Sequence, residues 1–451
     1  MNIKAVLSVA TATVLFATIA CGCDITDFGT ENLLRPPKAM GDEAEIEQLI
    51  SATAKKGYVL KYPKSGNYRS AIVMTDLDND KIDEAVAFYR EVDSTAIVNM
   101  LIMYSDKGKW KASNTIAVET TDIDSIDFAD IDGDSTQEII LGYSTFSINI
   151  NKLSGFKYKN GKTLEIKSGQ NYSSFYCGDF DADGVSEIMS LLMYTTENEA
   201  SATMIDYSAK ENTLYSKATV VMDPNVIKYH NVCIMDIDSS IKGIVVDGTN
   251  VLDEMSTQII YFNNEMSLLR NPLYTEKSAD KATNISKRNN FVFSQDIDKD
   301  GFIEFPITTK QSYSKGEDEK TVADKISWES FVTVNETTVK KLEVVANYEY
   351  DYIFKYSEKW SGNTITARID TDERKMTFYT WNGTVPDYVL FEIKVFDIDE
   401  WELGRDIDGY TLITKDDKYA FTFNNVNKES QYSLTDDEIK TAFSLLTKAD
   451  V

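Results

Sequence analysis

Histidine and basic residues are scarce in this chain of 451 residues. His230 is the only histidine, and 46 Lys and Arg stand against 73 Asp and Glu, which gives a formal net charge of -27. A single imidazole cannot build a zinc site with several His ligands, and every Ser/His/Asp or Cys/His nucleophile would have to use it. Contacts to nucleic-acid phosphates need clustered Lys and Arg, so we expect no nucleic-acid partner.

Proline and glycine are also scarce, with 7 and 21 residues, whereas 42% of the residues are hydrophobic and 11% are aromatic. This apolar content is enough for a large core, so the acidity does not indicate a disordered chain. Tyr, Phe, Ile and Val are plentiful, which favours strands over linkers and helical bundles. We therefore expect a fold dominated by β-structure and divided into two or three domains.

The first twenty residues form an apolar segment with one charge, Lys4, and they end immediately before Cys21. Small residues before a cysteine are typical of a lipoprotein signal peptide, and the segment is short for a membrane span. It resembles the bacterial lipobox, with Thr18 in place of the usual leucine. The resemblance implies a signal peptide over residues 1–20 and lipidation of Cys21, with Cys23 as the alternative. An ordinary secretory signal or a membrane anchor is the other interpretation.

The predicted lipid anchor places the protein outside the cytoplasm, attached to the cell membrane. Residues 21–41 then form a tether that holds the folded part away from the membrane. Apolar residues on one face predict a helix within residues 42–59, packed against the first part of the fold.

An acidic motif recurs along the chain. Its first copy reads Asp76-Leu-Asp78-Asn-Asp80 with Glu84 at the ninth position, and related copies begin at residues 130, 179, 236 and 296, so the spacing is 49 to 60 residues. Carboxylates at alternate positions of a tight loop, with a further acid that closes the shell, form an all-oxygen ligand set. Such a set suits Ca²⁺ better than Mg²⁺, which keeps several waters.

Two known motifs begin in this way. An EF-hand needs a bidentate Glu at the twelfth position and a helix on each side, whereas the twelfth residue of the complete copies here is apolar or serine. Short apolar runs such as 71–74 and 291–293 flank the copies, so we expect each loop to join two strands. The pattern resembles the FG-GAP or VCBS-type repeat, although the Phe-Gly and Gly-Ala-Pro flanks of that family are mostly absent.

The resemblance covers residues 60–345 and implies a β-propeller in which a calcium loop links neighbouring strands of each blade. Five repeats are recognisable, and six or seven blades remain open as alternatives. The resemblance implies about four Ca²⁺ sites. Their ligands would be Asp76, Asp78, Asp80 and Glu84; Asp130, Asp132, Asp134 and Glu138; Asp179, Asp181, Asp183 and Glu187; and Asp296, Asp298, Asp300 and Glu304. The copy with Asp236, Asp238 and Ser240 is degenerate, because acids are missing from its fifth and ninth positions. We expect this copy to bind calcium weakly or not at all.

The chain after residue 345 lacks a complete copy of the motif. Strand-like runs and a capping box at Thr435 and Glu438 predict a small α+β domain over residues 346–451 that ends in a helix. The sequence contains no Gly-rich phosphate loop and no Gly-x-Ser-x-Gly nucleophile elbow. We therefore expect a calcium-stabilised binding or scaffold module without evident catalysis, whose ligand is a glycan or a surface protein.

A carboxylate-based propeller glycoside hydrolase or lyase is the alternative, because a pair of carboxyl groups is sufficient for that chemistry. Two acids that converge outside the calcium loops, beside exposed aromatic side chains, would favour it.

Overall fold

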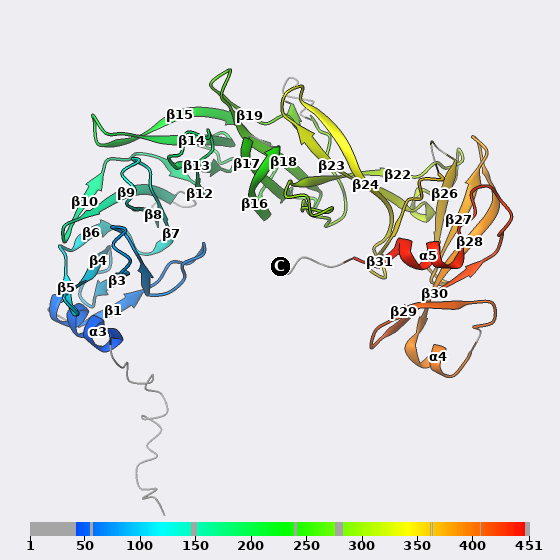
Figure 1. The fold of residues 1–451 in the computed structure, drawn as a ribbon, viewed down its shortest axis with the longest axis horizontal. Coiled ribbons are helices and arrows are strands. Elements are labelled where there is room, and N and C mark those ends of the chain that lie inside the picture. The colour runs from blue at the N-terminus through cyan, green and yellow to red at the C-terminus, as the bar shows by residue number, and fades with distance from the viewer. Residues whose placement is uncertain are drawn as a thin grey trace, which may run out of the picture.

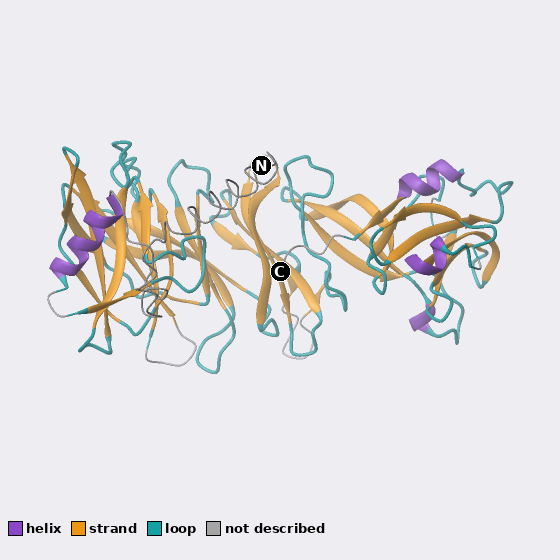
Figure 2. Ribbon diagram, turned by 90° about the horizontal axis from the view of Figure 1, so that it is seen from below, coloured by secondary structure: helices purple, strands orange, loops and turns teal. Residues whose placement is uncertain are grey.

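The computed structural model describes residues 42–54, 57–145, 151–238, 241–275, 283–360, 362, 364–405 and 407–446. Cys21, Cys23 and the predicted signal and tether segments lie outside these residues. Strands dominate the structure, as Figure 2 shows. None of the described helices is both long enough and apolar enough to cross a bilayer.

Antiparallel sheets follow one another along the chain, and we number them in chain order. Sheet 1 contains β1 (Tyr58–Lys61), β2 (Ile72–Thr75), β3 (Glu84–Glu91), β4 (Ile97–Asp106), β5 (Lys109–Ala112) and β6 (Ile116–Glu119). Sheet 2 contains β7 (Ile123–Ala129), β8 (Glu138–Ser144), β9 (Asn151–Lys159), β10 (Lys162–Ile166) and β11 (Asn171–Tyr172). Sheet 3 contains β12 (Ser174–Gly178), β13 (Glu187–Leu192), β14 (Ser201–Ser208) and β15 (Thr213–Val221).

Sheets 4 and 5 continue this order. Sheet 4 contains β16 (Lys228–Asp238), β17 (Ile241–Thr249), β18 (Met255–Asn263) and β19 (Leu268–Arg270), and β20 (Tyr274–Thr275) pairs with β21 (Thr283–Asn284) after it. Sheet 5 contains β22 (Glu304–Lys310), β23 (Asp324–Val332), β24 (Thr337–Asn347), β25 (Tyr352–Lys355) and β31 (Phe443–Leu445), with the 3₁₀-helix η1 (Glu319–Thr321) before β23. The C-terminal sheet has the order β26 (Ile365–Asp370), β27 (Lys375–Trp381), β28 (Pro386–Asp397), β30 (Tyr419–Asn425) and β29 (Thr411–Lys415).

The sheets pack face to face, and alternate residues of one strand enter different cores. In β8, Ile139 and Leu141 join the core shared with sheet 1, whereas Ile140 joins the core shared with sheet 3. In β17, Ile244 joins the core shared with sheet 3, and Val245 joins the core shared with sheet 5. Because successive side chains of a strand point to opposite faces, such strands are apolar throughout. This arrangement explains the continuous apolar runs after the acidic motifs.

The packed sheets follow an arc in Figure 1, from α3 (Asp42–Thr53) at one end to the C-terminal sheet at the other. Successive meander sheets stacked in this way are the blades of a propeller-type fold, so the predicted fold class is confirmed. The two ends of the arc lie apart in Figure 1. The predicted N-terminal helix is present as α3, and its Ile46 and Ile50 are buried against sheet 1.

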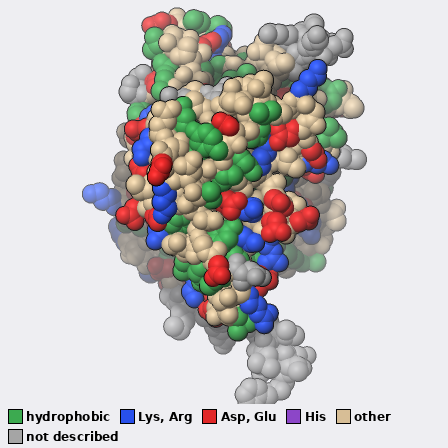
Figure 3. All heavy atoms as spheres, turned by 90° about the vertical axis from the view of Figure 1, so that its right-hand side faces the viewer, with side chains coloured by type: hydrophobic (Ala, Val, Ile, Leu, Met, Phe, Trp, Pro, Cys, Tyr) green, Lys and Arg blue, Asp and Glu red, His purple; other side chains and the backbone are tan. Residues whose placement is uncertain are grey.

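The C-terminal part combines strands and helices, as predicted, but the predicted terminal helix ends at Ala442 and the chain continues as β31, whose backbone pairs with β25. This part contains α4 (Ile398–Glu402) and α5 (Asp436–Ala442), and the capping box at Thr435 and Glu438 begins α5. β25 and β31 pair with each other, so the strand pairing of sheet 5 extends beyond residue 346, where we expected the C-terminal domain to begin. Figure 3 shows this end of the molecule, where hydrophobic side chains gather among acidic and basic ones.

The prediction of a strand at residues 291–293 is wrong. Residues 291–293 belong to no strand, and the nearest pairing after them is the isolated bridge between Gln295 and Glu304. The backbone near this segment bonds to side chains instead, since the N–H of Ser294 donates to Asp247 and the carbonyl of Val292 accepts from Arg288. These groups cannot also join a strand ladder.

Candidate calcium loops

Three of the complete acidic motifs form the loop of a β-hairpin, and the fourth leads from an isolated bridge into β22. We call them loop 1 (76–84), loop 2 (130–138), loop 3 (179–187) and loop 5 (296–304). In the first three loops the closing glutamate pairs with the residue before the first aspartate, as in Thr75 with Glu84. In loop 5 the bridge between Gln295 and Glu304 has the same position. Loops 1 to 3 therefore join neighbouring antiparallel strands, as predicted, whereas loop 5 has a strand only on its C-terminal side. None of the four loops lies between two helices, which excludes an EF-hand.

The first aspartate of each loop holds the turn. In loop 1 the Asp76 carboxylate accepts from the backbone N–H of Asp80 at 3.2 Å and of Lys81 at 2.9 Å. Asp179 and Asp296 make the corresponding pairs of bonds. Asp130 accepts from the N–H groups of Gly133 and Ser135, so its first bond comes from one residue earlier in the loop. The residues at the fourth and sixth positions have positive φ in all four loops, for example 61° at Asn79 and 93° at Gly301. Left-handed residues are uncommon outside glycine and asparagine, so the repeated shape is a specific feature of these loops.

The closing glutamates are buried and use one oxygen in the same way. Oε2 of Glu84 accepts from the N–H of Leu77 at 2.9 Å, and Glu138, Glu187 and Glu304 accept from the equivalent N–H groups at 3.1, 2.9 and 3.0 Å. Burial, with nearby aspartates, raises the pKa of Glu84 and of Glu138 to about 7 and that of Glu187 to about 8. These carboxyls are therefore short of positive charge in the calcium-free protein.

Two oxygens in these loops are buried without a hydrogen-bond partner, namely Oδ1 of Asp78 and Oε1 of Glu138. Leaving a buried carboxylate oxygen unpaired is costly, and a bound cation would satisfy it. The donors are all oxygens, which is the ligand type that calcium prefers. The residues present therefore fit a hard divalent cation.

The structure brings together part of each predicted ligand set. Ligand atoms lie within 4.8 Å of one another in four groups, which are Asp76, Asp78 and Glu84; Asp130, Asp132 and Glu138; Asp179, Asp181 and Glu187; and Asp296, Asp298 and Asp300. Outside these groups are Asp80, Asp134 and Asp183 at the fifth position of loops 1 to 3, and Glu304 in loop 5. Glu304 instead accepts from the Ser330 hydroxyl at 2.7 Å, and Asp80 from the N–H of Ile82 at 2.8 Å.

In each of three loops a different lysine contacts the acids, and the sequence did not reveal these lysines as part of the site. Lys217 lies 2.6 Å from Asp181 and 3.8 Å from Glu187, and Lys341 lies 3.3 Å from Asp298. In loop 2, Lys157 contacts Asp132, Asp134 and Glu138. None of the ion pairs found among the described residues brings a lysine to the acids of loop 1. Loop 1 therefore has the largest uncompensated negative charge of the four.

The degenerate copy has another arrangement. Asp238 pairs with Ile241 across the end of a tight β16–β17 hairpin, and Ser240 lies outside the described residues. The carboxylate of Asp238 accepts from the N–H of Thr333 at 3.3 Å and also from its hydroxyl, so it links sheet 4 to sheet 5. Asp236 lies within β16, where it pairs with Lys242. Weak or absent calcium binding at this copy stays a prediction.

Comparisons with known proteins yield structural likenesses only. No family model matches the chain, and no curated protein matches it. Sqt1 of Saccharomyces cerevisiae is 8% identical, with a TM-score of 0.32 over 72% of this chain and 74% of its own. The Dos1 propeller is 12% identical, with a TM-score of 0.28 over 70% and 65%. An exo-beta-1,3-galactanase from Phanerochaete chrysosporium is 8% identical, with a TM-score of 0.27 over 72% and 80%. At these TM-scores the likenesses support no conclusion, and the fold class rests on the strand pairing and sheet packing.

Proposed function

We propose that this protein is a calcium-stabilised, lipid-anchored, extracytoplasmic module that binds a glycan or a surface protein. The observation that carries the proposal is the fourfold repetition of one acidic loop, each with a buried closing glutamate. A bound calcium would supply the positive charge that the clustered carboxylates lack. The residues of each loop already share one backbone shape, which favours ligand atoms placed in advance of binding.

The loops would stabilise the packed sheets and leave recognition to other surfaces. Loops 1 to 3 each link two strands whose residues enter the cores between sheets, so fixing the loop also fixes the strand register there. Extracellular calcium modules bind with dissociation constants of about 10⁻⁴ to 10⁻³ M, which suits a compartment rich in calcium. The calcium requirement and the predicted lipid anchor thus point to the same location.

Thermal unfolding with calcium and with EDTA tests the calcium part. At a calcium concentration about 10 to 100 times the dissociation constant, each site adds about 1.4 to 2.7 kcal/mol to the free energy of unfolding. We expect a higher midpoint in calcium, a smaller difference in Glu84→Gln, and an unaltered difference in the matched control Asp236→Asn. Equal midpoints of the wild-type protein in calcium and EDTA would refute the calcium part.

Membrane fractionation tests the anchor. Cys21→Ala should move the protein from the membrane fraction to the soluble fraction, whereas Cys23→Ala should not. Retention of the Cys21→Ala protein in the membrane fraction would argue for the alternative site or another kind of anchor.

A further inference from the structure

We propose that the cavity between sheets 4 and 5 binds a neutral saccharide. The cavity has a volume of about 700 Å³ and is lined by β16, by the segment before loop 5, by Trp328 of β23 and by Tyr348 after β24. This size is within the range of small-molecule sites, which is roughly 300 to 1,000 Å³. The proposal deepens and rests on the proposed binding function, because it selects one of the two ligand classes and gives it a place.

The side chains in the cavity combine aromatic rings with amides. Phe291 is 50% exposed and Phe293 is half-buried, so both rings are accessible from the cavity, whereas Trp328 is fully buried and lies beneath its wall. Four amide side chains also line it: those of Asn289 and Gln295 are exposed, whereas Asn231 already donates to Asp247 and Asn290 to Asp324. Sugar rings have apolar C–H faces that stack on aromatic rings, and hydroxyl groups that both donate and accept hydrogen bonds. Amide side chains also do both, so the two surfaces match.

The same lining disfavours other ligand classes. The lining residues include no lysine or arginine, so no side chain of the cavity would pair with an anionic ligand. A purely apolar ligand would remove water from the amides without replacing their hydrogen bonds, at about 1 to 3 kcal/mol for each group. A neutral ligand with many hydroxyl groups satisfies both constraints.

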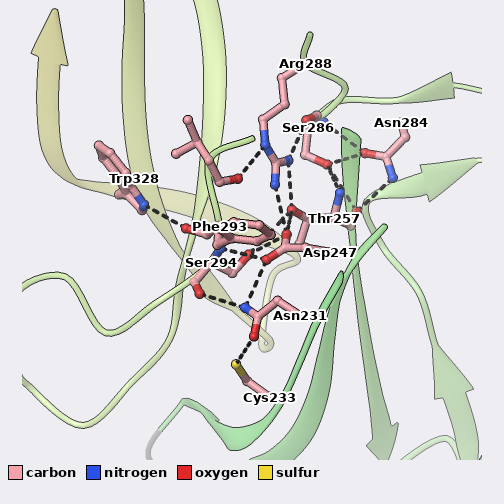
Figure 4. A network of polar contacts seen from close by, with 11 residues as sticks. Asn231, Cys233, Asp247, Thr257, Asn284, Ser286, Arg288, Phe293, Ser294 and Trp328 are labelled. Atoms are coloured by element: carbon pink, nitrogen blue, oxygen red, sulfur yellow. Dashed lines mark hydrogen bonds and ion pairs between the residues drawn. The ribbon is translucent and has the colours of Figure 1, made fainter. Parts of the chain in front are cut away.

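A buried ion pair holds the wall of the cavity, as Figure 4 shows. The side chains of Asp247 and Arg288 are both 0% exposed and lie 2.9 Å apart. The Asp247 carboxylate also accepts from the hydroxyls of Thr257 at 2.5 Å and Ser294 at 2.9 Å, from the N–H of Ser294 at 2.7 Å, and from the Asn231 amide at 3.2 Å. The carboxylate therefore joins β16, β18 and the segment before loop 5.

Arg288 completes this support from within the segment itself. Its Nε donates to the carbonyl of Val292 at 2.8 Å and its Nη1 to the carbonyl of Ser286 at 2.9 Å. These bonds fix the backbone on both sides of Asn289 and Phe291, whose side chains are exposed. A buried ion pair adds little net stability compared with apolar packing, but it can specify one conformation. Here it holds exposed recognition groups in fixed positions, as a binding site requires.

Affinity gel electrophoresis of the calcium-loaded mature protein in laminarin, xylan, galactomannan and dextran tests the proposal. Polygalacturonate serves as the anionic control, and isothermal titration measures affinity for any polysaccharide that retards migration. We expect retardation by at least one neutral polysaccharide. Phe291→Ala and Asn289→Ala should weaken its affinity by about tenfold or more, as loss of one stacking ring or one hydrogen-bonding group predicts. Both side chains are exposed, so the variants should fold, and their melting midpoints verify this.

The matched control is Tyr194→Ala, since Tyr194 is 56% exposed and lies outside the cavity lining. It should bind like the wild type. Lack of retardation by every neutral polysaccharide overturns the saccharide proposal, as does equal retardation by polygalacturonate. Binding that is insensitive to both cavity variants overturns this site while it supports the proposed binding function. If a neutral peptide binds instead of the polysaccharides, and both cavity variants weaken that binding, the saccharide class is overturned and the site is retained.

Discussion

Lys217→Met is expected to lower the stability of the protein without calcium and to raise the calcium affinity of loop 3. In the calcium-free protein Lys217 makes ion pairs with Asp181 at 2.6 Å, Asp206 at 3.1 Å and Glu187 at 3.8 Å. Its ammonium group therefore provides part of the positive charge that calcium would bring. Methionine keeps a long flexible side chain but removes the charge.

The magnitude follows from the ion pairs that calcium must displace. The Lys217 side chain is 25% exposed, and pairs near the surface contribute about 0.2 to 1 kcal/mol each. Three pairs together give about 0.6 to 3 kcal/mol, which corresponds to an increase of about 3-fold to 150-fold in the calcium affinity of loop 3. The same loss should lower the unfolding free energy of the protein in EDTA.

Calcium titration by calorimetry, together with melting curves in EDTA and in calcium, measures both effects. Lys111→Met is the matched control, because Lys111 pairs with Asp106 away from the four loops and is 50% exposed. Unchanged or weaker calcium binding in Lys217→Met, with wild-type behaviour of the control, would refute the view that the lysine and calcium share one site.

Three further predictions concern the buried groups. Asp247→Leu leaves Arg288 buried without its partner, so the unfolding free energy should fall by about 3 to 5 kcal/mol in urea titrations, and the double variant with Arg288→Met should recover much of it; equal losses in both would contradict this account. In EDTA the melting midpoint should fall as the pH rises from about 5 to about 8. Glu84 and Glu138 have pKa values of about 7 in the folded state and the ordinary value of 4.5 in the unfolded state, so between these values the folded state holds protons that the unfolded state has released. Calcium should remove this fall, and a flat profile in EDTA would count against the buried carboxyls. Gly142→Ala should destabilise the protein by about 1 to 3 kcal/mol, because a Cβ there would lie 1.9 Å from the Tyr172 hydroxyl, whereas Gly169→Ala meets no atom within 4 Å and should be neutral.

Local sequence patterns predicted much of this fold. The first, third, fifth and ninth positions of each motif identified the loops, because turn geometry and ligand spacing depend on neighbouring residues. The capping box at Thr435 likewise identified the start of α5. Both features are encoded within about ten residues of chain, so pattern reading was sufficient.

Contacts between distant residues were not predictable in this way. Lys217 and Lys341 are the extra residues at two shifts in strand register. Lys217 lies between the partners of Met204 and Ile205, which are Ala218 and Ser216. Lys341 lies between the partners of Trp328 and Glu329, which are Leu342 and Lys340. A β-bulge redirects a side chain, and ordinary alternation along a strand does not reveal it. The expected strand at 291–293 is absent, and the carbonyls of Val292 and Phe293 accept from the side chains of Arg288 and Trp328. Trp328 is 35 residues from Phe293 in the sequence, so local patterns do not reveal this contact.

The pairing of β25 with β31 has a consequence for how the protein is made. Tyr352 lies opposite Leu445, so the whole C-terminal sheet is inserted between two adjacent strands of sheet 5. During synthesis, β25 must wait for its outer neighbour until residues 443–445 have emerged. Sheets 1 to 4 depend on no such late strand and can fold as they appear. A chain that stops early in the C-terminal sheet would thus leave an unpaired strand edge on sheet 5, which is a recognised starting point for aggregation.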